Sequence, residues 1–488
     1  MTIFGLLSIP LVFGFLSLIS PARKLVQLFF VLGATVLGAG GWWVVLRFSS
    51  SGRIFALNEN LMIDAFSALF VLIIVSVGFL SSVYGAGYLF NETEPAIPTA
   101  KLRRYAFFFH LFLFTMLLTV CSNNLGIMWI AIEGTTLASA FLVNVDDKKS
   151  SIEAAWKYLI LCTVGIALAL FGIILVYYSV ASGAAGAGKE FLHWTFLMEK
   201  ARQLDPEIMK LAFVFVLVGY GTKMGLAPFH SWLPDAHSQA PSPVSALLSG
   251  VLLSCAAFGL VRFHSLTQVV TNSQFSGNLL ILFGMLSVAV ATPFILRQTD
   301  YKRLFAYSSV EHMGLVAVGF GFGGKIGIYG ALLHVVNHAF TKSLLFFTSG
   351  HLLYYYRTKE IQKISGMIKK VPFLGTIFFL GVLAIAGLPP FSIFVSEFII
   401  LVSGFIAERF VICAFLLFLL ALIFAGLLKH ASGMVFGSGE QPAVTKKSVL
   451  MNNVLCVGII LILVSGFYIP NFLSRLLEGA SQIIQGKS

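Results

Sequence analysis

The stretch GTKMGLAPFHSWLPDAHSQAPSPVSALLSG, residues 221–250, decides the fold, because it interrupts a long apolar region with a lysine and four prolines. Proline inside a helix removes a backbone hydrogen bond and clashes with the preceding turn. Within a membrane, such a break is tolerated only where it is buried in protein or lines a water-filled cavity. The stretch therefore predicts a membrane protein in which one spanning helix is broken.

A second break of the same kind, GLPPF at residues 387–391, interrupts the apolar segment 372–403. Two interrupted helices at corresponding positions are the sequence sign of inverted repeats in transporter-type folds. We therefore expect an all-α integral membrane fold of about fourteen transmembrane helices, with two inverted five-helix repeats and with helices 7 and 12 broken.

The composition supports a lipid environment. Of the 488 residues 58% are apolar and 11% are charged, whereas a soluble domain has about 25% charged residues. The net charge of +12 comes from lysines and arginines scattered over short loops, which argues against a nucleic-acid partner. The five cysteines stand singly and form no motif for an iron–sulfur cluster or zinc. We expect neither a cofactor nor a metal.

The spans follow from the rule that a transmembrane helix needs about 20 mainly apolar residues. They are predicted near 2–20, 25–47, 62–84, 105–121, 125–143, 155–182, 208–227, 243–263, 275–297, 302–323, 325–356, 372–403, 406–429 and 450–472. The corresponding division is three helices and a loop at 1–104, five-helix repeats at 105–264 and 275–430, and a loop with the last helix at 431–488.

The orientation follows from the basic residues, most of which fall in the loops after odd-numbered spans. Because cytoplasmic loops are enriched in lysine and arginine, these loops are predicted to face the cytoplasm. We therefore expect a multi-pass protein of the inner (plasma) membrane with both termini on the outer, periplasmic side.

Several ionisable residues lie inside predicted spans, where one charge costs about 2.5–3.5 kcal/mol on insertion scales. Glu133, Lys223 and Glu397 each stand among apolar residues, the last two close to a break. A further set comprises His334, His338 and Lys342, spaced to share one helix face, together with the neighbours Glu311 and His312.

Two interpretations of these residues compete. In the first, they pair with one another and their sole role is to hold the helices together. One intramembrane polar contact, however, contributes typically only about 0.6 kcal/mol. Alternatively, they can pass protons to one another, since carboxyl, amine and imidazole groups in a low dielectric hold their charge less firmly than in water. Six or more such groups favour the relay. The spacing of His334 and His338 could also suggest a metal site, but Lys342 follows in register and no carboxylate does.

Four motifs resemble one known family. They are residues 221–250, QTDYKRLFAYSSVEHMG at 298–314, LLHVVNHAFTKSLLF at 332–346 and GLPPFSIFVSEF at 387–398. They look like the antiporter-like, proton-translocating subunits of complex I, of Mrp-type cation/proton antiporters and of group 4 hydrogenases. Residues 153–172, 204–215 and 308–314 most resemble the hydrogenase-4 F component, and then the complex I M subunit.

The resemblance implies a buried axis of proton-carrying groups, and it implies that redox chemistry takes place in partner membrane subunits. Its relay positions fall on Glu133, Lys223, His334, His338, Lys342 and Glu397. It implies no catalytic residue and no redox centre in this chain.

One position departs from the family pattern. Where relatives carry a lysine or histidine on the eighth helix, the segment 245–259 offers only Ser249 and Ser254. A hydroxyl can order water but cannot store a proton near neutral pH. Accessory groups that could help at this gap are His230, His237 and His264. The resemblance favours a proton-translocating subunit of a redox-driven complex. Two alternatives stay open: an Mrp-type antiporter module and a membrane scaffold with a partly decayed relay.

Overall fold

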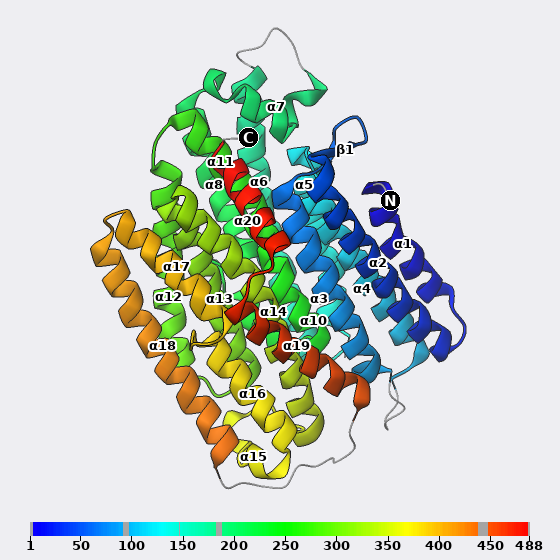
Figure 1. Cartoon of the computed structure of the whole chain (residues 1–488). Coiled ribbons are helices and arrows are strands. Elements are labelled where there is room, and N and C mark those ends of the chain that lie inside the picture. Colours follow the sequence, from blue (N-terminus) through cyan, green and yellow to red (C-terminus); the bar gives the residue numbers. More distant parts are fainter. Residues whose placement is uncertain (1–2, 91–96, 146, 182–187, 438–447, 487–488) are drawn as a thin grey trace.

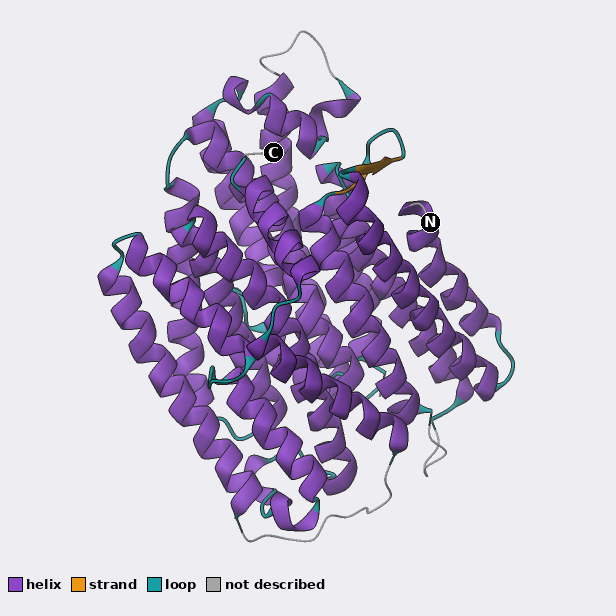
Figure 2. Ribbon diagram, in the orientation of Figure 1, coloured by secondary structure: helices purple, strands orange, loops and turns teal. Residues whose placement is uncertain are grey.

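The computed structural model describes residues 3–90, 97–145, 147–181, 188–437 and 448–486. In these ranges the chain forms a bundle of helices with one short antiparallel hairpin, β1 (Ile54–Ala56) and β2 (Leu61–Ile63). Figure 2 shows that helices make up almost the whole molecule. The predicted all-α class is confirmed.

The long helices, α20 excepted, follow the predicted spans closely. They are α1 (Ile3–Ile19), α2 (Arg23–Ser51), α3 (Ala65–Leu89), α4 (Thr99–Val120), α5 (Leu125–Val143), α6 (Lys149–Ala181), α8 (Pro206–Met224), α11 (Leu253–Thr271), α12 (Phe275–Leu296), α13 (Tyr301–Phe322), α14 (Gly324–Tyr356), α16 (Pro372–Ile385), α17 (Ser392–Ile406), α18 (Phe410–Phe436), α19 (Val449–Phe467) and α20 (Asn471–Ile484). Shorter helices include α7 (Trp194–Glu199), α9 (Trp232–Gln239), α10 (Ser242–Leu247) and α15 (Met367–Lys370).

Nine helices within the described ranges are long and apolar enough to cross a membrane. The remaining predicted spans coincide with α1, with the two halves of a broken helix, and with α8, α13 and α14. The last three carry the buried ionisable residues, which lower their mean hydropathy. The outer surface is strongly apolar: Val411 on α18 is 83% exposed, and Ile130 and Val164 are each about three-fifths exposed. In water these side chains would be unfavourable, so the surface fits lipid.

The centre of the bundle is formed by α3, α10, α11, α13 and α14, whose residues are almost all buried. In Figure 1 these helices lie between the dark blue α1 and α2 and the orange α18. Small residues allow close packing, because a β-carbon added at Gly314 would lie 2.6 Å from the backbone oxygen of Gly284. Such small-residue contacts are how membrane helices approach each other.

Both predicted breaks are present. Helix α8 ends at Met224, and Gly225 follows in the left-handed conformation at φ 83°. Helix α16 ends at Ile385, and Gly387 has φ 72° before α17 begins. A third irregularity was not predicted: Leu248–Leu252, between α10 and α11, forms a π-helical turn. Such turns occur often at functional sites.

The C-terminal helix α20 corrects the prediction that the last span runs over 450–472. Helix α19 ends at Phe467, and α20 then packs along α3 and α14. The backbone oxygen of Ile484 accepts a hydrogen bond of 2.7 Å from Ser265. A rule based on continuous apolar stretches misses α20, because its polar and apolar residues alternate with helical spacing.

A buried ion pair that the sequence did not suggest joins α3 to α11. Arg262 lies 2.8 Å from Asp64, and both side chains are almost fully buried. The guanidinium also stacks on the ring of Trp194 at 4.2 Å, which fixes the α7 segment to the bundle.

Candidate functional site

Glu133 and Lys223 are joined through a threonine hydroxyl. Thr136 donates to Glu133 Oε2 at 3.2 Å, and its oxygen accepts from Lys223 Nζ at 2.7 Å. A hydroxyl can donate one hydrogen bond and accept others, so Thr136 serves both groups at once. These two described side chains make no direct ion pair. The carboxylate and the ammonium are therefore linked through Thr136 and not by direct contact.

Glu133 is also less buried than expected. It lies partly exposed on α5 and accepts a second hydrogen bond of 2.7 Å from Thr163 on α6. The apolar residues beside Glu133 in the sequence therefore do not enclose its carboxylate.

Lys223 is fully buried at the last turn of α8. Its ammonium donates to the hydroxyl of Tyr158 at 2.7 Å, and this hydroxyl shares a further 2.7 Å hydrogen bond with Ser139. Because the backbone carbonyls of a final turn lack helical partners, a helix C-terminus attracts a cation. The break after Met224 therefore places Lys223 where the backbone itself favours a positive charge.

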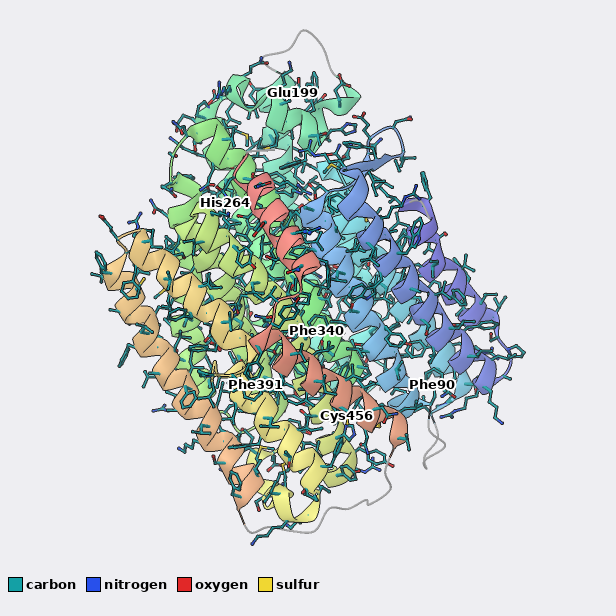
Figure 3. All side chains as sticks on the ribbon, in the orientation of Figure 1. Phe90, Glu199, His264, Phe340, Phe391 and Cys456 are labelled. Carbon is teal, nitrogen blue, oxygen red and sulfur yellow. The ribbon has the colours of Figure 1, made fainter. Side chains whose placement is uncertain are left out.

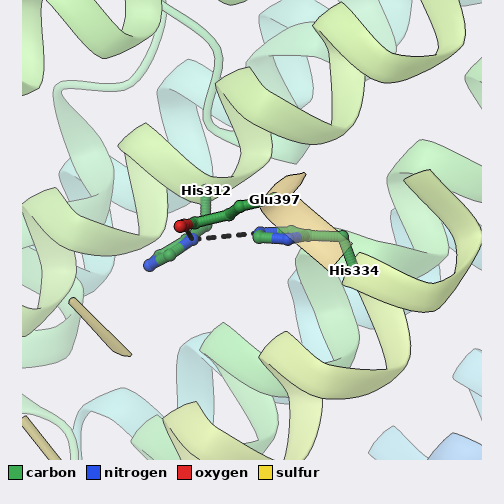
Figure 4. Close-up of side chains that lie close together, drawn as sticks. All are labelled: His312, His334 and Glu397. Atoms are coloured by element: carbon green, nitrogen blue, oxygen red, sulfur yellow. Dashed lines mark hydrogen bonds and ion pairs between the residues drawn. The ribbon is translucent and has the colours of Figure 1, made fainter. Parts of the chain in front are cut away.

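A second cluster lies between α13, α14 and α17. His312 Nδ1 and His334 Nε2 are 3.0 Å apart, and His334 Nδ1 is 3.0 Å from Ser396. Figure 4 shows that His334 and the Glu397 carboxylate both approach Nδ1 of His312, and the carboxylate lies 3.9 Å from this atom. Glu311 lies on the other side of the ring, 3.7 Å from Nε2. His312 is thus the hub of this cluster.

Lys342 and His338 lie beside this hub on the same face of α14. The Lys342 ammonium donates to the Phe305 carbonyl at 2.9 Å and to Ser308 at 2.8 Å, both on α13. The His338 ring is 5.5 Å from that of His312, and neither of its nitrogens has a protein hydrogen-bond partner. Buried polar atoms of this kind are usually held by ordered water.

Two accessory candidates, His237 and Ser249, contact the helices that carry the second cluster. His237 on α9 stacks on Phe346 of α14 at 4.8 Å, one turn beyond Lys342. Ser249, inside the π-helical turn, shares a 2.7 Å hydrogen bond with Ser309 on α13. Both residues therefore lie on the side of Lys342 that faces α9 and α10.

The other accessory candidates lie elsewhere. The Ser254 hydroxyl bonds to the backbone oxygen of Gly250 in its own turn. His264 bonds to Ser276 and, in Figure 3, lies toward the end of the molecule that carries Glu199. His230 is partly exposed near Tyr307. The structure brings none of these three into either cluster.

Three groups of the second cluster could hold a metal ion. One ligand atom from each of His312, His334 and Glu397 lies within 4.8 Å of the others. The sequence had drawn attention instead to His334 and His338. The two close imidazole nitrogens already share a hydrogen bond in which one of them carries a proton, so the same geometry serves proton transfer.

The hydroxyl groups were missed by a search confined to ionisable residues. Thr136 stands three positions after Glu133, and Ser308 three before Glu311. Helical spacing places such neighbours on one face, so these two could have been found. Tyr158 and Ser396 come from other helices, and their contacts depend on the tertiary fold.

Comparison with known proteins places these features in context. The family described as NADH:quinone oxidoreductase/Mrp antiporter, TM, matches residues 122–424. The chain is 42% identical over 345 residues to a hydrogenase-4 component F homolog of Methylacidiphilum infernorum (isolate V4), covering 70% of this chain and 72% of that protein. It is 30% identical over 329 residues to NADH-quinone oxidoreductase subunit M of Pseudomonas aeruginosa, covering 67% and 63%, respectively.

Solved structures share the fold. A chain of the membrane-bound sulfane sulfur reductase, an archaeal respiratory membrane complex, superposes with a TM-score of 0.88 at 23% identity, covering 99% of this chain and 98% of that one. A chain of the Mrp complex from Dietzia sp. DQ12-45-1b gives a TM-score of 0.86 at 16% identity, covering 99% and 97%. At these identities the likeness concerns the fold alone.

Proposed function

Because the chain belongs to the NADH:quinone oxidoreductase/Mrp antiporter transmembrane family, we propose that it moves protons across the membrane as one subunit of a redox-driven complex. The proposed setting is the inner membrane, with both termini outside and with other membrane subunits as partners. The observation that carries the proposal is the buried arrangement of Lys223, Lys342, His312, His334 and Glu397, held by hydroxyls and helix ends.

The proton relay must work against the membrane potential. Moving one proton against 100 mV takes about 2.3 kcal/mol. Lys223, released from Thr136 and Tyr158, passes its proton toward His237 and Lys342, and His338, His312 and His334 then carry it to Glu397. Glu397 is 9% exposed, which suits a group that hands protons to the outside or to a neighbouring subunit.

The predicted division fits this pathway. The first five-helix unit, 105–264, supplies Glu133 and Lys223, and the second, 275–430, supplies Lys342, the histidines and Glu397. Each half then contributes one broken helix next to one charged group.

The proposal is tested with the assembled complex in sealed liposomes, by following proton uptake with a pH-sensitive dye during electron transfer. We expect uptake that a protonophore collapses and that proceeds without sodium. The family also contains Mrp antiporters, and transport that needs sodium and runs without electron transfer would instead identify an antiporter module.

Substitution of Thr136 by valine tests the link between Glu133 and Lys223. A hydrogen bond to a charged group contributes about 1.5–3 kcal/mol, so we expect coupled uptake to fall by about 10- to 100-fold. Thr135→Val is the matched control, because its hydroxyl bonds only to the Ile132 carbonyl of its own helix. Equal uptake in the two variants would remove Thr136 from the pathway.

A further inference from the structure

A buried chain of polar side chains outside the two clusters connects α3, α14 and α19. The Tyr84 hydroxyl donates to the Phe347 carbonyl at 2.7 Å and lies 3.0 Å from His351 Nδ1. His351 Nε2 lies 3.1 Å from Asn452 Oδ1 on α19. Tyr84 and His351 are buried, whereas Asn452 is partly exposed. This series of hydrogen-bonded side chains thus begins at the surface and leads inward.

The hydrogen bonds of His351 allow the ring to gain and lose a proton. If Tyr84 donates to Phe347, Nδ1 donates to the Tyr84 oxygen, and with Nε2 donating to Asn452 Oδ1 the imidazole carries both protons. If Tyr84 instead donates to Nδ1, the ring is neutral with its proton on Nε2. A neutral ring with its proton on Nδ1, which also lies 3.3 Å from the Phe347 carbonyl, keeps its bonds if the Asn452 amide turns over and donates to Nε2. Asn452 can therefore follow the protonation of His351.

The inner end of the chain continues toward Lys342 along one face of α14. A β-carbon added at Gly350 would lie 2.5 Å from the Tyr84 hydroxyl and 3.1 Å from Ser242 Oγ, so both oxygens border the same point. Ser242 Oγ is buried and has no protein partner. Lys342, Phe346 and Gly350 follow one another by one turn each, and His237, whose ring nitrogens also have no protein partner, lies over Phe346.

We propose that Asn452, His351, Tyr84, Ser242 and His237 form a proton-uptake branch that feeds Lys342. This inference rests on the proposed function and adds an entrance to it. The branch opens near the end of α14, beside the segment 357–371 with its five basic residues, which is the predicted cytoplasmic side.

Each transfer conserves protons. A proton from water binds His351 at Nε2 and gives the doubly protonated ring. The Nδ1 proton then passes to the Tyr84 oxygen, while Tyr84 gives its own proton past Gly350 to Ser242, which passes its hydroxyl proton on through water. His237 receives that proton and hands it to Lys342 once Lys342 has lost its proton to the second cluster. Tyr84 and Ser242 are again neutral hydroxyls, and His351 is neutral with its proton on Nε2; the ring and the hydroxyls turn back before the next proton enters.

The branch is tested in the reconstituted complex with His351→Gln and Tyr84→Phe. Glutamine keeps hydrogen bonds to the neighbours but cannot carry a proton, so a purely structural role would leave transport intact. We expect both variants to assemble and to lose at least about tenfold in uptake per electron, because positioned proton carriers speed a transfer by this much or more.

Two further variants make the result decisive. Gly350→Ala keeps every polar group but fills the point between Tyr84 and Ser242, and we expect the same loss. Gly433→Ala is its control, because no atom lies within 4 Å of the added methyl group. Asn452→Leu changes only the partly exposed outer end and is expected to slow uptake even if a buried variant does not fold.

The outcomes separate the two proposals. Normal uptake in His351→Gln, Tyr84→Phe and Asn452→Leu, with uptake lost in Lys342→Leu, would overturn the branch and leave the proposed function standing. Normal uptake in all four variants would overturn the proposed function itself.

Discussion

Replacement of Lys223 by alanine is expected to abolish proton uptake while electron transfer to an artificial acceptor continues. Lys223 is the only described ionisable side chain bonded to both Thr136 and Tyr158, so the relay has no substitute at this point. Losing a positioned proton carrier slows transfer by about 10²–10⁴-fold, which brings uptake down to passive leak. Dye-monitored uptake in proteoliposomes, normalised to electrons transferred, measures the effect.

The matched control is Lys210→Ala on the same helix. Lys210 pairs with Glu207 at 2.6 Å and is partly exposed, so its loss changes the charge of α8 without touching the interior. We expect uptake within about twofold of the unaltered protein, because exposed ion pairs contribute about 0–1 kcal/mol. If the double variant Lys223→Met, Glu397→Gln retained normal coupled activity, the chain would be a scaffold with a decayed relay.

Much of the fold could be predicted because the membrane imposes a simple rule on backbone. Continuous apolar stretches predicted the outer helices, and the prolines predicted the breaks, where the structure has Gly225 and Gly387 in the left-handed conformation. Helix α20 was missed because it packs sideways on other helices and needs only one apolar face. The π-helical turn at Leu248–Leu252 contains no proline, and its packing against α14 cannot be seen in the sequence.

The candidate site could be predicted only in its charged members. A lone charge in an apolar stretch is visible in a sequence, so Lys223 and Lys342 stood out. What each charge contacts is a tertiary fact: His334 meets His312 of α13 rather than His338 of its own helix. His351 was overlooked because it lies near a helix end, where a histidine is unremarkable until Tyr84 and Asn452 are seen beside it.

Substitution of Lys342 by leucine is expected to stop proton transfer between the two halves of the chain. Its ammonium is fully buried, with Phe305 and Ser308 on one side and the His338 and His312 rings beside it. Leucine fills a comparable volume without leaving a buried charge, so we expect the helices to pack as before. Uptake per electron should fall by about 10²-fold or more, since no neighbouring amine replaces the carrier.

Lys325→Leu provides the control for this experiment, because Lys325 is an exposed residue at the start of the same helix. Arginine at position 342 gives a second comparison. It keeps a positive charge against the Phe305 carbonyl but does not release its proton in proteins. If Lys342 only neutralised its surroundings, Lys342→Arg would transport normally. If Lys342 carries the proton, arginine and leucine fail alike, and only a group that can lose its charge restores uptake.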